Sequence, residues 1–404
     1  MTNTPPPPKP AKWLNSTVLG IGLATLCSDV GHEMATTVLP AFLTLLGGNS
    51  ALLGLIEGSA DGLSSFSKLL SGWYSDRLPR RKPLAVAGYL VTASGMASFT
   101  LATQWWHVLI GRTCGWIGRG VGKPVRNVLL TEATSPETYG RAFGFRGAMD
   151  SAGAVIGPLL ATAIVARSGV RSVFVWTLVP GILAALLIVL CVREREHPAP
   201  SKTPLWGGLK SLPVPFRRYL FGIGIAGIGD FSNTLLILWA TQAWTPELGL
   251  GPAAQRAMLF YVGYNVVFTF ACYASGWLAD RFPKYAVLSI GYSLALIPAI
   301  ALATPGTSLA KFAVVFVVSG LYMGVWETLE NATAAELLPA ESRGVGFGML
   351  ATVNGLGDFV SSALVGVLWS FTPAGAMTLV AVTSLVGSAI IFRTGRQARV
   401  TPAA

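Results

Sequence analysis

The sequence SGWYSDRLPRR, at residues 71–81, occurs a second time in the chain in a diverged form. SGWLADRFPKY begins at Ser275, and the offset between the two copies is 204 residues in a chain of 404. The same offset aligns Asn127 with Asn331 and extends to further identities on either side of that pair. Identities kept in one register over about seventy residues indicate that the chain is one half followed by a copy of itself.

The composition indicates what these halves are. Hydrophobic residues make up 52% of the chain, charged residues only 12%, and the mean hydropathy is +0.58. Soluble domains carry about twice that fraction of charged residues. The apolar runs are about twenty to thirty residues long, which is enough to cross a bilayer as helices, and they lack the strict alternation of barrel strands. The sequence therefore predicts an all-α integral membrane protein.

Twelve apolar stretches are expected, six in each half. Residues 1–12 are predicted to be a disordered cytoplasmic tail, and they lack the features of a signal peptide. The predicted N-terminal half covers 13–192, a charged and proline-rich cytoplasmic linker covers 193–216, the C-terminal half covers 217–394, and 395–404 form a second tail.

The loop charges predict the orientation. Lys and Arg concentrate after the second stretch, in the linker and at the C-terminus, which places both termini in the cytoplasm. The net charge of +11 is explained by a cytoplasmic face held against anionic lipid, so we expect no nucleic-acid partner. We expect a multi-pass protein of the plasma membrane, in a bacterium the inner membrane, that works as a monomer.

The residues resemble the major facilitator superfamily, whose G-x-x-x-D-R-x-x-R-R signature is matched by Gly72, Asp76, Arg77, Arg80 and Arg81. The resemblance covers almost the whole chain and implies a fold of 12 transmembrane helices in two pseudo-symmetric six-helix halves. It implies a secondary transporter that rocks these halves around a site near the middle of the bilayer. Since one fold hosts many functions, it says little about the substrate.

The second copy of the signature keeps three residues, Gly276, Asp280 and Arg281, and then departs from it with Lys284-Tyr285. The expected role of the signature is a latch that closes the cytoplasmic side in one state, with carboxylates that cap helices and pair with arginine. The following residues are predicted to take part in this gating: Gly72, Asp76, Arg77, Arg81, Glu132, Arg141, Asp280 and Arg281.

Charged residues inside apolar stretches are functional candidates, because each costs about 2.5–3.5 kcal/mol at the bilayer centre. Subtracting the repeat offset maps Glu327 onto Lys123 and Glu330 onto Arg126, with opposite signs. We therefore predict a basic wall on one half and an acidic wall on the other. The predicted substrate-binding residues are Arg119, Lys123, Arg126, Asp230, Glu327, Glu330 and Asn354.

Proton coupling requires carboxylates or histidine whose proton affinity changes between states. Asp29, His32 and Glu33 share one helix face, and Glu57 and Asp61 share another. These five residues are the predicted proton-coupling group. Structural roles are open as alternatives to function for these charges. In one, Glu57 and Asp61 neutralise Arg119 or Lys123 between helices. In another, Arg146 forms an ion pair with Asp150 within its own helix. Asp358 is either a cavity residue or the partner of a cytoplasmic-end group.

The first functional prediction is a proton-coupled transporter of a small organic solute that is anionic or bears carboxylates, including siderophore-like chelates. The alternative is a drug–proton antiporter, which Gly153-x-x-x-Gly157-Pro158 favours through its similarity to a motif of the family's antiporters. A membrane-embedded enzyme or a non-transporting receptor is a third class. The three histidines lie on different segments and the four cysteines show no paired spacing, so no enzyme, cofactor or metal site is expected.

Overall fold

The structure is a computed structural model, and it describes residues 13–48, 50–194, 204–230, 233–304 and 306–400. All regular secondary structure in these ranges is helical, as the sequence predicts. The predicted disordered tail at 1–12 and the end of the chain at 401–404 lie outside the described residues. Eight helical spans in the described ranges are long and apolar enough to cross a membrane.

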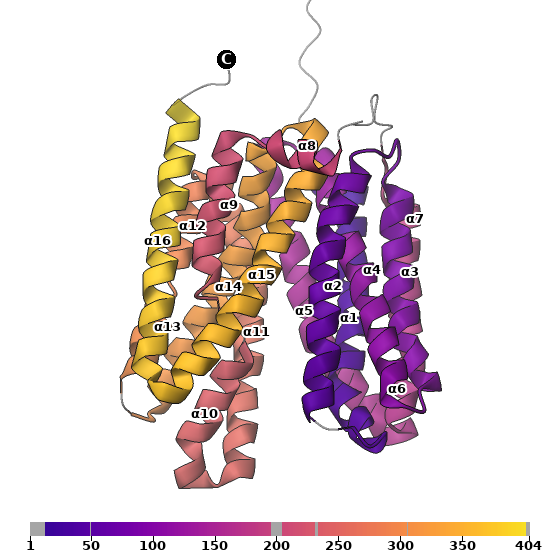
Figure 1. Ribbon diagram of the computed structural model, residues 1–404, viewed down its shortest axis with the longest axis vertical. Helices are drawn as coiled ribbons and strands as arrows, with labels where there is room; N and C mark the ends of the chain where they lie inside the picture. Colours follow the sequence, from indigo (N-terminus) through magenta and orange to yellow (C-terminus); the bar gives the residue numbers. More distant parts are fainter. Residues whose placement is uncertain (1–12, 49, 195–203, 231–232, 305, 401–404) are drawn as a thin grey trace, which may run out of the picture.

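The first half is built of six helical segments, and successive segments run in opposite directions (Figure 1). Its elements are α1 Ser16–Leu45, α2 Ser50–Ser75, α3 Lys82–Ala97 with η1 Ser98–Leu101, α4 Trp105–Glu132, η2 Pro136–Thr138, α5 Tyr139–Ser168, and α6 Val170–Trp176 with α7 Leu178–Cys191.

The second half repeats this order after α8 Leu205–Lys210, a short helix in the linker. Its elements are α9 Val214–Gly227 with α10 Asn233–Leu248, α11 Leu250–Ala279, α12 Lys284–Ser293 with α13 Leu296–Ala303, α14 Leu309–Leu337, η3 Ala340–Ser342, α15 Arg343–Phe371 and α16 Pro373–Val400.

Two boundaries differ from those expected. The second half begins at Val214, because Pro213 and Pro215 suit the first turn of a helix and start α9 before residue 217. The expected tail that begins at 395 is helical as far as Val400, where α16 ends. Four of the twelve helical segments are divided into two elements, and Asp230 lies between α9 and α10.

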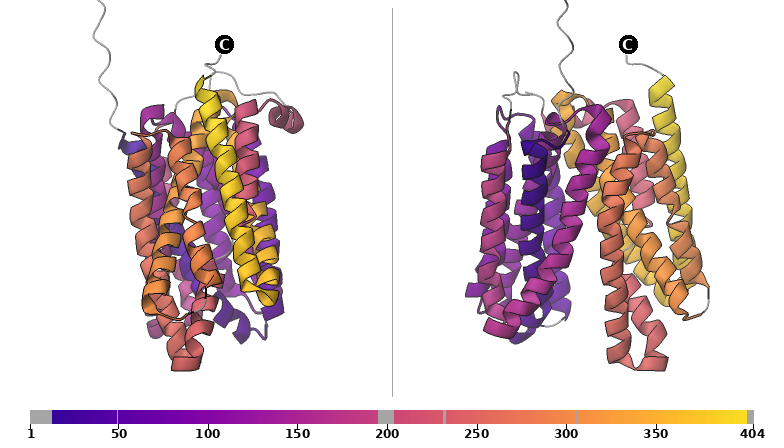
Figure 2. Two further views of the ribbon diagram at one scale, coloured as in Figure 1. Left: turned by 90° about the vertical axis from the view of Figure 1, so that its left-hand side faces the viewer. Right: turned by 180° about the vertical axis from the view of Figure 1, so that it is seen from behind.

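The two halves lie side by side and meet most closely at one end, which we name the linker end because it carries α8 (top of Figure 1). Towards the opposite end the ribbons of the halves diverge, which is also visible from behind (Figure 2). Contacts between the halves join α2 to α15, α5 to α11, and α5 to α14.

A pseudo-two-fold axis relates the halves. Asn127 on α4 donates a hydrogen bond to Asn331 on α14 at 2.7 Å, and these residues are 204 positions apart. Arg343 donates to the hydroxyl of Tyr139 at 3.1 Å over the same separation. Residues that correspond in the two copies therefore touch each other where the axis passes, which confirms the interpretation of the repeat.

Candidate functional site

A buried ion pair joins α1 to α4. Asp29 pairs with Arg119, and the Asp29 side chain is buried. Asp150 on α5 lies beside the same carboxylate. α5 comes this close because it has glycine where it crosses α1: a Cβ added at Gly153 would stand 2.7 Å from the Cβ of Asp29. The predicted G-x-x-x-G stretch therefore packs α5 against the acidic face of α1.

The other members of the predicted proton-coupling cluster lie on the same face of α1. His32 is buried, and its ring meets the ring of Trp116 edge-on with 4.9 Å between centroids. Its Nδ1 is buried and has no hydrogen-bond partner in the described residues. Glu33 is half-buried, and a Cβ added at Gly157 would stand 2.6 Å from its Cβ.

Glu57 has a different partner from those expected. It forms an ion pair with Arg112 at 2.9 Å, whereas the sequence interpretation placed it opposite Arg119 or Lys123. Arg112 is fully buried and also donates to the hydroxyl of Thr36 at 3.0 Å. It thus ties α4 to α1 and α2. Asp61, one turn after Glu57, is exposed.

Three cations on α2 and α4, Lys68, Lys123 and Arg126, have no carboxylate at ion-pair distance among the described residues. Arg126 bonds to the hydroxyl of Tyr89 at 3.3 Å. Lys68 is a residue that the sequence interpretation missed. It stands seven residues after Asp61 on the same face of α2, and that spacing was the available signal.

The central contact between the halves is an ion pair. Arg146 on α5 pairs with Glu327 on α14, and both side chains are buried. This corrects the interpretation of Arg146 as the partner of Asp150. The physical reason is that α5 packs on α14 beside the pseudo-two-fold axis, so the charge of Glu327 needs a cation from the other half. Glu327 is thus part of the interface between the halves, and its role in substrate binding stays a prediction.

Glu330 is held by side chains of its own half. It accepts hydrogen bonds from the hydroxyl of Tyr292 and, at 2.6 Å, from the amide of Asn354. Three helices, α12, α14 and α15, therefore converge on one fully buried carboxylate. Tyr292 was not predicted, because nothing in its sequence context distinguishes it from a lipid-facing tyrosine.

Two further acids lie in the second half. Asp230 follows the end of α9, its carbonyl accepts a hydrogen bond from Ser361, and it lines a cavity of about 40 Å³ together with Tyr264 and Tyr322. Asp358 is exposed on α15. Every Lys and Arg of the second half among the described residues lies near a helix end, so these acids have no cation in their own half.

The first latch joins α2 to α15 at the linker end. Asp76 accepts hydrogen bonds from the backbone N–H groups of Gly344, at 2.9 Å, and Val345, at 2.8 Å. These are unsatisfied donors of the first turn of α15, so the carboxylate caps a helix of the opposite half. Burial raises the pKa of Asp76 to about 6, while the two N–H groups and Arg81 act in the opposite direction.

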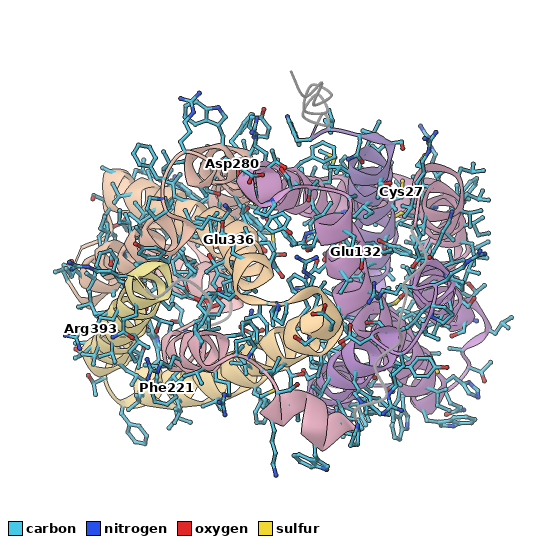
Figure 3. All side chains as sticks on the ribbon, turned by 90° about the horizontal axis from the view of Figure 1, so that it is seen from above. Cys27, Glu132, Phe221, Asp280, Glu336 and Arg393 are labelled. Carbon is cyan, nitrogen blue, oxygen red and sulfur yellow. The ribbon has the colours of Figure 1, made fainter. Side chains whose placement is uncertain are left out.

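The second latch joins α11 to α5 in the same way. Asp280 accepts from the N–H groups of Gly140, at 2.8 Å, and Arg141, at 3.1 Å, and also from Nε of Arg141 at 2.6 Å. It lies where the two halves meet (Figure 3). Gly140 is the repeat partner of Gly344, so the two latches are copies of each other.

The other predicted gating residues surround these latches. Gly72 lies against the backbone of Gly344 with no room for a Cβ. Arg81 is buried and pairs with Glu132. Arg77 lies over the ring of Trp73 at 4.0 Å, and Arg281 lies over that of Trp277 at 3.6 Å.

The structure thus consists of two pseudo-symmetric helical bundles that meet at one end, with buried charges between them. A family model described as "Major Facilitator Superfamily" matches residues 21–362. The chain belongs to the major facilitator superfamily, as the sequence motifs indicated, and it is a transporter rather than an enzyme.

Relatives and solved structures agree with this assignment. The chain is 26% identical to an uncharacterized MFS-type transporter of Methanocaldococcus jannaschii over 384 residues, 95% of this chain and 94% of the relative. It is 23% identical to the multidrug resistance protein MdtH of Salmonella paratyphi C over 83% of this chain and 82% of the relative. The fold matches the fucose–proton symporter FucP in its outward conformation, with a TM-score of 0.76, 16% identity, and coverage of 94% of this chain and 98% of that one.

Proposed function

We propose that the chain is a proton-coupled secondary transporter of small organic anions, carboxylates above all. The observation that carries this proposal is the placement of Lys68, Lys123 and Arg126. These cations occupy two neighbouring helices of one half, and no carboxylate of the described residues lies at ion-pair distance from any of them. A charge held in the membrane without a counter-ion is costly, and an anionic substrate supplies the missing counter-ion.

Acidic residues of the opposite half make substrate binding depend on their protonation. Lys123 is near enough to Glu330 and Asp358 of the opposite half for its charge to act on both, although it forms no ion pair with either of them. A bound carboxylate therefore competes with these acids for the same cation. Protonation of either acid removes the competitor and strengthens substrate binding. Substrate and proton therefore bind together, which is the requirement for symport.

The reaction cycle follows from the contacts between the halves. With the linker end closed, Asp76 and Asp280 cap helices of the opposite half, and Arg146 is paired with Glu327. Opening this end breaks all three contacts. Arg146 then retains a carboxylate one turn away on its own helix, Asp150, which keeps its charge compensated while the halves rock.

The proton-coupling residue of the first half is Asp29. It pairs with Arg119, and Asp150 lies beside the same carboxylate. A proton on Asp29 neutralises the carboxylate and so weakens its pair with Arg119. His32 and Glu33 lie on the same face of α1 as Asp29, towards Arg112, and are the other titratable groups of this face.

Transport by the purified protein in liposomes with an imposed pH gradient tests both the anion site and the proton-coupling residue. We expect Lys123→Gln to lower accumulation of radiolabelled citrate at least tenfold, while Asp29→Asn retains exchange of citrate but loses accumulation driven by the gradient. Arg256→Gln, which removes a cation near the start of α11 and away from α4, is the matched control. Citrate uptake by Lys123→Gln equal to that of the wild type would remove the anion site from α4.

A second candidate function is a drug–proton antiporter, as in the alternative drawn from the sequence. Two observations favour it. Asp230, Glu330 and Asp358 have no cation in their own half, which suits a cationic solute, and the MdtH relatives bear the name of multidrug resistance proteins. Uptake of a lipophilic cation such as tetraphenylphosphonium into inverted vesicles distinguishes the two. Cation transport that Glu330→Gln abolishes, without any citrate transport, would establish the antiporter.

The proposal also includes the cellular setting. We propose that the protein lies in a bacterial inner membrane with the linker end and both termini on the cytoplasmic side, and the concentration of basic residues at the linker end supports this orientation. The contacts that close the linker end are made within one chain, so we propose that the monomer is the working unit.

A further inference from the structure

A basic groove lies on the outer face of the second half, remote from the site between the halves. It runs between α9 and α16 at the linker end and has a volume of about 580 Å³. Its upper wall carries Arg217 and Arg218 on α9 and Arg393 on α16. Seen from the linker end, Arg393 and Phe221 lie on the outer edge of the second half (Figure 3).

The arginines of this groove are available to a ligand. All three are exposed, and no carboxylate of the described ranges lies at ion-pair distance from them. Arg218 is oriented by a hydrogen bond to Oε1 of Gln397 at 3.0 Å, which is a neutral partner. Three guanidinium groups on two helices thus line one groove, and the described residues supply no counter-charge to them.

The groove is divided by depth into a charged part and an apolar part. Phe221 lies one turn after Arg217 on α9, and Ile390 lies one turn before Arg393 on α16, so both apolar residues are further into the membrane than the arginines. A second groove of about 450 Å³ shares Arg217 and Phe221 and is otherwise lined almost entirely by apolar residues, among them Leu212 and Val353.

A comparable groove in the first half lacks these properties. It is lined by Arg80, Lys82 and Glu194, so it contains its own acid. Glu194 accepts a hydrogen bond from the N–H of Lys82 at 3.0 Å, and the Lys82 ammonium caps the carbonyls of Val189 and Val192. Glu194 and the Lys82 ammonium of this groove are therefore already hydrogen-bonded within the protein.

We propose that the groove between α9 and α16 binds an anionic phospholipid of the surrounding bilayer. The phosphate lies among Arg217, Arg218 and Arg393, and an acyl chain follows Phe221 into the adjoining apolar groove. Basic pockets between membrane helices recognise lipid headgroups in this way, and the apolar continuation selects a lipid over free phosphate.

Native mass spectrometry of the detergent-purified protein tests the proposal with added palmitoyl-oleoyl phosphatidylglycerol. We expect one lipid molecule to be retained, and the double variant Arg217→Gln/Arg393→Gln to weaken its binding by about fivefold for each arginine removed. Phe221→Ala should weaken it as well, because the acyl chain loses its contact. Arg396→Gln, an exposed arginine of α16 that does not line the groove, should bind within twofold of the wild type.

Three outcomes would overturn the site. Equal retention of phosphatidylcholine would remove the role of the arginines as selectors of an anionic lipid. Displacement of the lipid by millimolar inorganic phosphate would reduce the site to an anion site. An effect of Arg396→Gln as large as that of the double variant would assign binding to the general positive charge of this end.

Discussion

The two latches at the linker end have the same backbone geometry and different cations. In both, an aspartate accepts from two N–H groups in the first turn of a helix of the opposite half. The cations differ. Arg81 pairs with Glu132 in the first half, while Lys284, one repeat position earlier, pairs with Glu336 in the second. Both copies of the repeat have thus kept the carboxylate on a helix N-terminus. The position and type of the cation that pairs with the neighbouring glutamate have changed.

The glycines of the latches give the largest expected effect. Gly72→Ala and Gly276→Ala each place a Cβ onto a backbone carbonyl of the opposite half, of Gly344 and Gly140 respectively, which cannot move aside like a side chain. We expect both variants to lose the state that is closed at the linker end. Distances between nitroxide labels at the linker ends of the two halves, measured by pulsed electron resonance, report this state.

The same helices supply matched controls. A Cβ at Gly62 on α2 or at Gly263 on α11 meets nothing within 4 Å, so Gly62→Ala and Gly263→Ala should keep the wild-type distances. Closure that persists in Gly72→Ala but fails in Gly276→Ala would mean that the latches are copies in sequence but not in function.

Loss of Arg81 should mainly lower the stability of the fold, whereas loss of Lys284 should mainly reduce closure of the linker end. Arg81 bonds only within the first half, to Glu132 and the carbonyl of Ser75, whereas Lys284 also donates to Pro136 of the other half at 3.0 Å. Arg81→Ala removes a buried guanidinium together with its hydrogen bonds to Glu132 and to the carbonyl of Ser75, and it should lower the stability of the fold by about 2–3 kcal/mol. Lys284→Ala should reduce closure more than stability. Thermal unfolding and the label distances separate the two effects, and identical profiles for both variants would contradict this difference.

The pH dependence of closure tests the first latch alone. The pKa of Asp76 is raised to about 6 in the closed state, and it returns towards its usual value of about 4 when α15 moves away and water enters. The closed state therefore binds a proton more tightly, and this contribution favours closure at low pH and is lost as the pH rises through 6. Between pH 7 and 5 the closure equilibrium should shift by about tenfold. Asp76→Asn should remove this part of the shift; an unchanged pH profile in that variant would assign it to other groups.

The smallest expected effect concerns the residue that distinguishes the second latch. Arg141 adds a guanidinium to Asp280, whereas its repeat partner is the apolar Val345. Because Arg141 is 31% exposed, a double-mutant cycle of Asp280→Asn and Arg141→Ala should give a coupling of only about 0.5–1 kcal/mol for closure. The cycle of Asp76→Asn with Val345→Ala is the control and should show no coupling beyond error.

The fold could be predicted from the sequence because it depends on the apolar pattern and on the repeat. The aspartates that cap helices at the linker end could be singled out because they lie in a local motif, while their role in gating stays a prediction. The sequence did not predict the partner of each buried charge. Helical spacing shows which residues share a face, but it does not show which neighbouring helix that face meets. Arg146 and Asp150 share a face of α5, and the rotation of α5 turns Arg146 towards Glu327. Lys68 and Tyr292 were missed for the same reason, since their importance depends on helices far away in sequence.

The hydrogen bond between Asn127 and Asn331 has a consequence for how such a chain can arise. A residue on a two-fold axis meets its own copy, so in an ancestral pair of identical halves it had to be complementary to itself. The carboxamide of asparagine meets this condition because it carries both a donor and an acceptor, whereas two like charges would repel. Away from the axis the condition disappears, and there fusion into one chain has allowed the copies to take opposite signs, as at Lys123 and Glu327.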